Sequence, residues 1–139
     1  TKDVSIFEIG KGFYKKGLEY GENSKLCVLM SGKYFDGIGL GTIAGAEKPL
    51  DFFILKGVAE EILDYLGYNN RYSFVIPKDI PAEFHPGQVA EISVNNDIVG
   101  IIGRVHPLIT DDISKQPVFV MEINLDKLLE YAVEIINRL

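Results

Sequence analysis

The clearest pattern of apolar and polar positions in the chain predicts an amphipathic helix over residues 51–67. Its apolar side chains recur at steps of three and four residues, so they share one helical face, and charged side chains lie mostly opposite. The apolar positions are Phe52, Leu55, Val58, Ala59, Ile62, Leu63 and Leu66. Asp51 can cap the first free backbone N–H groups, and Gly67 can close the last turn in the left-handed conformation. We predict that this helix packs on an apolar surface.

Gly57 lies inside this predicted helix. A glycine in a helix interior costs about 1 kcal/mol relative to alanine, so it indicates either a close approach by another backbone or a tolerated glycine. The sequence leaves both interpretations open.

Apolar runs of a different period predict five or six strands. They are expected at residues 4–9, 26–30, 72–76, 88–94, 98–105 and 117–123. Asn95-Asn96-Asp97 separates two alternating runs, which is the clearest hairpin signal in the chain. Gly100 and Gly103 within the second of these runs indicate a bulge or a tight backbone contact. The run at 26–30 is apolar throughout, so we expect it to be buried on both faces, with Cys27 as a small buried hydrophobic residue.

The segments between the strands predict turns, loops and a second helix. We expect a glycine-bounded basic turn at Lys11–Gly17, a glycine-rich loop at Ser31–Lys48, an ordered loop at Lys78–Gly87, a short helix or turn at Leu108–Lys115 and an amphipathic helix at Asp126–Leu139. Strands and helices do not alternate regularly, as they would in a parallel sheet. We therefore predict an α+β fold with helices packed on a mostly antiparallel sheet.

The composition narrows the class of protein. A length of 139 residues suits one domain (residues 1–139), and 47% hydrophobic and 24% charged residues are ordinary for a globular chain. Residues 1–50 carry seven basic and six acidic groups, whereas residues 51–139 carry seven basic and fourteen acidic ones. Such an acidic domain is a poor surface for a phosphate backbone, so we expect no direct binding of nucleic acid. Without a membrane-length apolar run or a signal-peptide pattern, a cytoplasmic location is predicted.

Both histidines precede prolines, at His85-Pro86 and His106-Pro107. Two imidazoles with Glu83 or Glu91 could hold zinc or iron, but their 21-residue spacing matches no ligand pattern. Proline pushes the preceding residue towards extended geometry, so His-Pro also suits a strand end. We expect a turn-fixing hydrogen bond from each histidine and keep a metal or small-molecule site as the alternative.

No other catalytic or cofactor-binding set emerges. Gly37, Gly39 and Gly41 precede a helix, but their spacing fits neither the dinucleotide fingerprint nor the P-loop, so a flexible loop is favoured over a phosphate site. The acidic pairs Glu60-Glu61 and Asp111-Asp112 are adjacent in sequence and point in different directions, which favours solvated faces over a general acid–base pair.

Six motifs, taken in order, resemble the catalytic-like domain of the β subunit of bacterial-type phenylalanyl-tRNA synthetase. They are Phe7-Glu8-Ile9-Gly10 with Phe13; Ser31-Gly32; Asp51-Phe52-Phe53 with Leu55-Lys56-Gly57; Phe84-His85-Pro86-Gly87 with Ala90-Glu91-Ile92; Ile102-Gly103 with His106-Pro107; and Val118 to Leu125. The resemblance covers nearly the whole chain.

The resemblance implies a fold and a role. In that family this domain has the antiparallel sheet of class II synthetases and is a degenerate copy that scaffolds the α subunit, which carries the active site. The whole enzyme is an (αβ)₂ heterotetramer that uses ATP and magnesium to attach phenylalanine to its tRNA. This chain is then expected to be an inactive fragment of a longer β chain that binds no cofactor and, alone, no tRNA. Gly57 would allow close helix packing, and both His-Pro dipeptides would fix strand ends.

Three departures from the family pattern stand beside the matches. Ile54 replaces a usual aspartate, Gln88 replaces a common arginine, and the chain has no tryptophan, although the family often has one in the loop before Asp51. These differences leave a divergent member and a paralogue with another partner as open interpretations. If the scaffold role holds, we expect an exposed apolar surface where other parts of the enzyme dock.

Overall fold

The computed structural model describes residues 4–16, 19–35, 47–111 and 116–137. Its elements in chain order are β1 (Val4–Lys16), β2 (Glu19–Ser31), β3 (Lys33–Phe35), β4 (Glu47–Pro49), α1 (Phe52–Tyr65), β5 (Tyr72–Val75), β6 (Phe84–Val94), β7 (Asp97–Val105), α2 (Pro107–Thr110), β8 (Val118–Asn124) and α3 (Leu125–Asn137). No helix among these residues is both long and apolar enough to cross a membrane.

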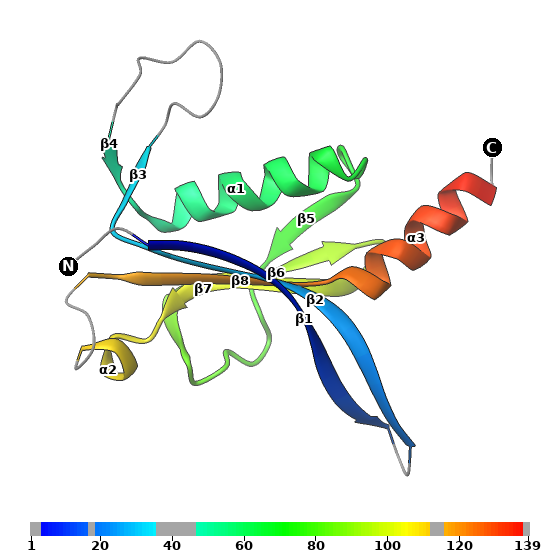
Figure 1. Ribbon diagram of the computed structural model, residues 1–139, viewed down its shortest axis with the longest axis horizontal. Helices are drawn as coiled ribbons and strands as arrows, with labels where there is room; N and C mark the ends of the chain where they lie inside the picture. The colour runs from blue at the N-terminus through cyan, green and yellow to red at the C-terminus, as the bar shows by residue number, and fades with distance from the viewer. Residues whose placement is uncertain (1–3, 17–18, 36–46, 112–115, 138–139) are drawn as a thin grey trace.

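The fold is built on one six-stranded sheet in the order β1-β2-β8-β7-β6-β5 (Figure 1). Every neighbouring pair in it is antiparallel. The last strand of the chain, β8, lies between β2 and β7, so it joins the N-terminal hairpin to the C-terminal one. α1 lies along one face of this sheet, and β3 and β4 form a separate two-stranded sheet. The predicted α+β fold with a mostly antiparallel sheet is confirmed.

Helix α1 begins and ends where the sequence predicts. Asp51 Oδ1 accepts a hydrogen bond from the Ile54 backbone N–H at 2.8 Å, which caps the first turn. Gly67 has φ of 92° after the last turn, and the Tyr68 N–H donates to the Leu63 carbonyl at 2.9 Å. Because only glycine adopts this conformation without strain, the helix stops there.

The predicted apolar face of α1 packs on the sheet. Leu55, Ala59 and Leu63 are fully buried, and the core that they join continues through β2, β6, β7 and β8. The sheet contributes Val28, Met30, Ile92, Ile102, Phe119, Met121 and Ile123. Leu66 departs from the prediction: it is 44% exposed because it follows the last helical residue, outside the helical repeat. From α3, Leu128 joins the core, and the Tyr68 hydroxyl donates a hydrogen bond to its carbonyl oxygen.

The β6–β7 hairpin turns at Asn95 and Asn96. Both have positive φ, 54° and 64°, as a two-residue type I′ turn requires. Both predicted glycine contacts in β7 are present. A Cβ added to Gly100 would lie 2.6 Å from the Glu122 carbonyl oxygen, and one added to Gly103 would lie 2.7 Å from the Phe84 ring. Each glycine is thus needed for a neighbour to approach closely.

The predicted turn at Lys11–Gly17 is wrong over the residues that the structure describes. β1 continues to Lys16, paired residue by residue with β2 from Val4↔Ser31 to Lys16↔Glu19. Gly10 and Gly12 therefore lie within a strand, where the regular pairing outweighs their low strand propensity. Gly17, the last residue of the predicted turn, lies outside the described part.

The predicted burial of residues 26–30 on both faces is also wrong. Val28 and Met30 are buried beneath α1, but Cys27 is exposed and Leu29 is 36% exposed. The reason is that no helix among the described residues covers the other face of the sheet at this strand. Gly57 is likewise not in close contact, since nothing lies within 4 Å of a Cβ added there. The prediction of a close approach at Gly57 is therefore wrong, and the tolerated glycine remains.

Several predicted loops contain regular structure. β3 and β4 occupy both ends of the Ser31–Lys48 segment, while residues 36–46, with Gly37, Gly39 and Gly41 of the predicted flexible loop, lie outside the described part. The Lys78–Gly87 loop ends earlier than predicted, because β6 already begins at Phe84. α2 provides the predicted short helix, although residues 112–115 are not described. In α3, Leu129 is 63% exposed rather than on the packed face.

Candidate functional site

The first candidate site is a cluster that joins the start of β6 to the end of β7. Phe84 pairs with Val105, but Val89 pairs with Gly103, so β6 bulges over the intervening residues opposite Arg104. The Phe84 side chain is buried and fills the space over Gly103. The His106 N–H donates to the Glu83 carbonyl at 2.8 Å. The register therefore brings the two His-Pro dipeptides together although they are distant in sequence.

Each histidine fixes its own turn. The Gly87 N–H donates to His85 Nδ1 at 3.0 Å, and the Leu108 N–H donates to His106 Nδ1 at 3.1 Å. The two rings stack with centroids 6.3 Å apart and an angle of 29° between their planes. His106 is thereby the N-cap of α2, with Pro107 in its first turn. The predicted turn-fixing hydrogen bonds are confirmed.

This hydrogen bonding decides which nitrogen carries the proton. An Nδ1 that accepts from a backbone N–H has no hydrogen of its own, so in each neutral ring the proton is on Nε2. A metal bound at Nε2 would displace that proton and cost the Nδ1 bond or the neutral charge of the ring. Among the described residues, no three His, Cys, Asp or Glu side chains are grouped to hold a metal ion. The pair is arranged as two turn caps, and nothing in it favours the metal or small-molecule alternative.

We expect His106→Ala to lower the free energy of unfolding by about 1 kcal/mol, since it removes a helix cap and leaves the Leu108 N–H without its acceptor. His106→Asn, which can also accept at an N-cap, is expected to recover most of the loss. Urea denaturation followed by circular dichroism measures both. Leu108→Ala is the control, because this side chain is 82% exposed. Equal stability of the alanine and asparagine variants would show that the cap is unimportant.

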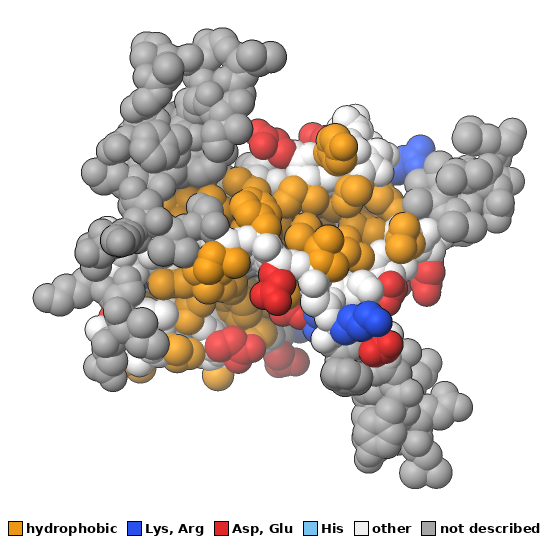
Figure 2. Space-filling model, in the orientation of Figure 1, with side chains coloured by type: hydrophobic (Ala, Val, Ile, Leu, Met, Phe, Trp, Pro, Cys, Tyr) orange, Lys and Arg blue, Asp and Glu red, His pale blue; other side chains and the backbone are white. Residues whose placement is uncertain are grey.

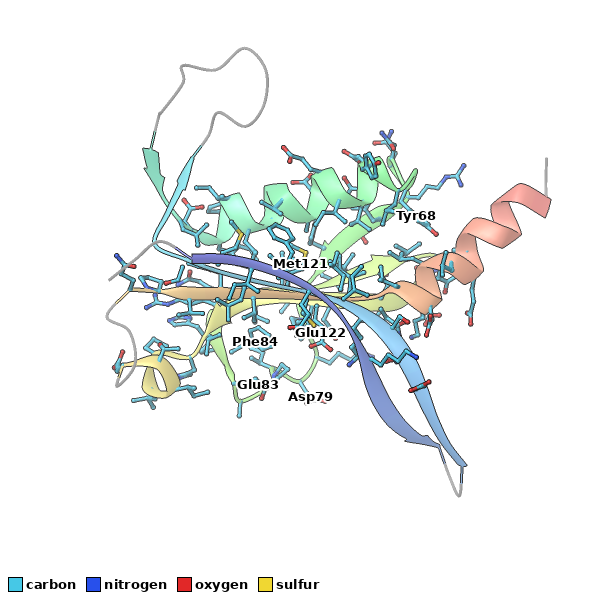
Figure 3. All side chains as sticks on the ribbon, viewed as in Figure 1. Tyr68, Asp79, Glu83, Phe84, Met121 and Glu122 are labelled. Atoms are coloured by element: carbon cyan, nitrogen blue, oxygen red, sulfur yellow. The ribbon has the colours of Figure 1, made fainter. Side chains whose placement is uncertain are left out.

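The second candidate site is the sheet face opposite α1, which we call the open face. Cross-strand register places Glu8, Cys27, Glu122, Ile101 and Glu91 in one row across β1, β2, β8, β7 and β6. A parallel row beside it is apolar, with Ile6, Leu29, Val120, Gly103 and Val89. Figure 3 shows Glu122, Phe84, Glu83 and Asp79 on this side of the sheet, opposite Met121 and Tyr68. The open face therefore carries carboxylates between apolar side chains.

One cation in the neighbouring row is paired with this acidic row. Lys25 Nζ lies 2.5 Å from Glu122 Oε1, with both side chains about half exposed, which makes a modest salt bridge. Partial burial raises the pKa of the Cys27 thiol, Glu122 and Glu8 raise it further, and Lys25 opposes them. Cys27 is therefore exposed, but its raised pKa lowers the fraction of reactive thiolate.

Glu122→Gln is expected to speed alkylation of Cys27 by iodoacetamide roughly threefold at pH 8, because a lower thiol pKa increases the thiolate fraction. Mass spectrometry of timed samples gives the rates. Glu61→Gln, on the exposed side of α1, should leave the rate unchanged. A Glu122→Gln rate equal to that of the unchanged chain would mean that the carboxylate does not act on the thiol.

The chemistry of the open face does not suit a nucleotide. Triphosphate groups bind to arginine, lysine or backbone N–H groups, whereas this row offers three carboxylates, and Lys25 beside it is already paired with Glu122. Alternation in the predicted strands was the signal that could have located the row, since Glu8, Glu91 and Glu122 each alternate with apolar residues.

The remaining predicted motif residues lie on the other side of the sheet, in or beside α1. Asp51 caps this helix, and the Phe52 ring packs edge-on against Phe53, which is 77% exposed. Lys56 Nζ lies 5.1 Å from the centre of the Phe74 ring. The structure therefore separates the α1 motif residues from the Phe84–Gly87, Gly103 and His106-Pro107 cluster.

Comparison with known proteins shows which family has this combination of fold and motifs. Residues 1–125 match the family model of the phenylalanyl tRNA synthetase beta chain CLM domain. The phenylalanine–tRNA ligase beta subunit of Staphylococcus aureus (strain COL) is 33% identical over 137 residues, and that of strain MRSA252 is 32% identical over 137 residues. In both cases the alignment covers 99% of this chain and 16% of the relative.

A solved structure shares the fold. Pyrrolysyl-tRNA synthetase from Desulfitobacterium hafniense superposes with a TM-score of 0.65 at 15% identity, over 96% of this chain and 43% of that one. This likeness confirms the class II synthetase-type fold expected from the sequence. The chain belongs to the phenylalanyl-tRNA synthetase beta chain CLM domain family.

Proposed function

We propose that this chain is a non-catalytic scaffold and subunit-interface domain of the β chain of phenylalanine–tRNA ligase. The observation that carries the proposal is the family match across residues 1–125. The acidic open face supports it further, since carboxylates repel the phosphates that an adenylate-forming site must hold. The domain would act by holding its partner in place, while the partner performs the chemistry.

The proposal extends to the whole enzyme. The chain spans 16% of the length of its matched relatives, and we take residues 1–139 to be one domain of a longer β chain. The proposed partner is the α subunit, in an (αβ)₂ assembly that attaches phenylalanine to tRNA in the cytoplasm. ATP and magnesium would be used in the α subunit, and tRNA would be contacted by other parts of the enzyme. The residues of the six shared motifs would serve structure rather than catalysis.

The test is capture of a phenylalanyl-tRNA synthetase α subunit by this chain, together with an adenylate-formation assay on each component separately. We expect capture by a chain that forms no phenylalanyl-adenylate alone. Adenylate formation by the isolated chain would overturn the non-catalytic role. A failure to capture the α subunit, with the chain folded by circular dichroism, would overturn the interface role.

A further inference from the structure

The edge of the sheet at β1 is unusually long and unprotected. β1 has 13 residues and β2 is its only described neighbour, whereas β5 at the opposite edge has four residues. In an antiparallel pair, every second residue directs its N–H and C=O away from the partner strand. β1 therefore presents a row of free backbone donors and acceptors, and its described part contains no proline to block pairing.

The hydrophobic core also runs out at this edge. On the α1 side, the row from Ile102 through Met121 and Val28 is at most 1% exposed, yet it ends at Phe7, which is 59% exposed. The next row passes through buried Ile123 and ends at Ile9, which is 71% exposed. In Figure 1 β1 lies at the front, and Figure 2 shows apolar side chains gathered on this front face. Both rows of core side chains therefore end in exposed residues on β1.

These features specify the chemistry of what would cover the edge. Free backbone donors and acceptors would pair with an extended peptide, which would add a seventh strand to the sheet. Exposed Phe7 and Ile9 would be covered by apolar side chains opposite them on the α1 side. Glu8, on the open face, would pair favourably with a basic side chain opposite it. The matching strand alternates apolar, basic and apolar residues.

A second copy of this chain fits this requirement poorly. When two copies of β1 pair antiparallel about a two-fold axis, the side chains of each sheet face lie on the same side in both copies. Even-numbered residues of one copy therefore lie opposite even-numbered residues of the other. Among the β1 residues whose side chains the structure describes, 6–11, the only cation is Lys11, which is odd-numbered and so never faces Glu8 in such a pair. The register that sets Phe7 opposite Ile9 sets Glu8 opposite Glu8, and like charges directly opposite each other destabilise a strand pair.

We infer that the β1 edge binds a strand of the partner subunit, with a lysine or arginine opposite Glu8 and apolar residues opposite Phe7 and Ile9. This inference rests on the proposed interface function and assigns it a surface. Strand addition completes the backbone ladder and covers the exposed ends of both core rows in a single step.

A peptide and a pair of variants test it. The peptide probe has the palindromic core Thr-Val-Lys-Val-Thr, capped at both ends and labelled for fluorescence anisotropy. Its control carries N-methyl groups on the amides that would face β1, which removes their donors. For the whole subunit, Ile9→Lys is compared with Ile76→Lys in the α-subunit capture assay, since Ile76 is 84% exposed away from this edge.

We expect the chain to bind the probe and not to bind the N-methylated control. Glu8→Lys is expected to bind the probe about fivefold more weakly. A probe with glutamate in place of lysine is expected to restore the affinity of this variant. Ile9→Lys is expected to lower the affinity for the α subunit at least tenfold, and Ile76→Lys to leave this affinity unchanged. Equal capture by both variants would overturn the inference and leave the proposed function standing. If the unchanged chain captures no α subunit, the proposed function is overturned. The assignment of the bound strand to that subunit is then overturned as well. Dimerisation abolished by Ile9→Lys would overturn it in favour of a second copy.

Discussion

Phe119→Ala is expected to lower the free energy of unfolding by about 4 kcal/mol, a large fraction of the total stability that a single domain usually has. Phe119 is 2% exposed in β8 and belongs to the core cluster between the sheet and α1. Removing the ring gives up its burial and leaves a cavity that the antiparallel neighbours on both sides of β8 cannot collapse to fill. Urea denaturation at constant pH, followed by circular dichroism, measures the loss.

Phe53→Ala is the matched control for this prediction. It removes the same ring from the first turn of α1, where the side chain is 77% exposed, so a change within about 0.5 kcal/mol is expected. A similar loss for both phenylalanines would show that Phe53 is covered in solution, for example by self-association. Repeating the urea denaturation over a tenfold range of protein concentration identifies self-association, because only then does the stability depend on concentration.

Gly100→Ala is expected to cost about 3 kcal/mol, although it adds a single methyl group. The added Cβ would lie 2.6 Å from the Glu122 carbonyl oxygen and 3.3 Å from the Ile123 Cα. Because both are backbone atoms of the neighbouring β8, no side-chain rotation relieves the clash, and the β7–β8 pairing must open. Thermal and urea denaturation should both register the loss.

Gly57→Ala is the control with the opposite expected sign. Nothing lies within 4 Å of a Cβ at this position, which is inside α1. Alanine is expected to stabilise the chain by about 0.5 to 1 kcal/mol, since it restricts the unfolded backbone more than glycine does. A loss of stability at Gly57 would mean that another surface approaches this helix, as the resemblance to the synthetase family first implied.

Local signals predicted the elements that carry their own start and stop residues. Asp51 and Gly67 mark both ends of α1, and Asn95 and Asn96 mark the hairpin turn, because caps and positive-φ turns are specified by a few adjacent residues. The two glycines of β7 could be interpreted for the same reason. A glycine within a strand by itself indicates that a neighbouring atom occupies the space where a side chain would lie.

Features that depend on distant pairing were not predictable in this way. Cys27 and Leu29 are as apolar as their buried neighbours, so the pattern could not show that one face of β2 lacks a cover. The glycines near Lys11 suggested a turn, whereas pairing with β2 keeps them in a strand. The histidines stack because of the β6–β7 register, and no spacing along the chain encodes that contact.

The central position of β8 also has a consequence for biosynthesis. Within this domain β1 and β2 are synthesised before the other described elements, but β2 obtains its second neighbour only when residues 118–124 have emerged, after β3 to β7. Until then the β1–β2 hairpin lacks the strand that joins it to the rest of the sheet. Such long-range closure slows folding and exposes strand edges to aggregation, so we expect the nascent chain to depend on chaperones until β8 inserts.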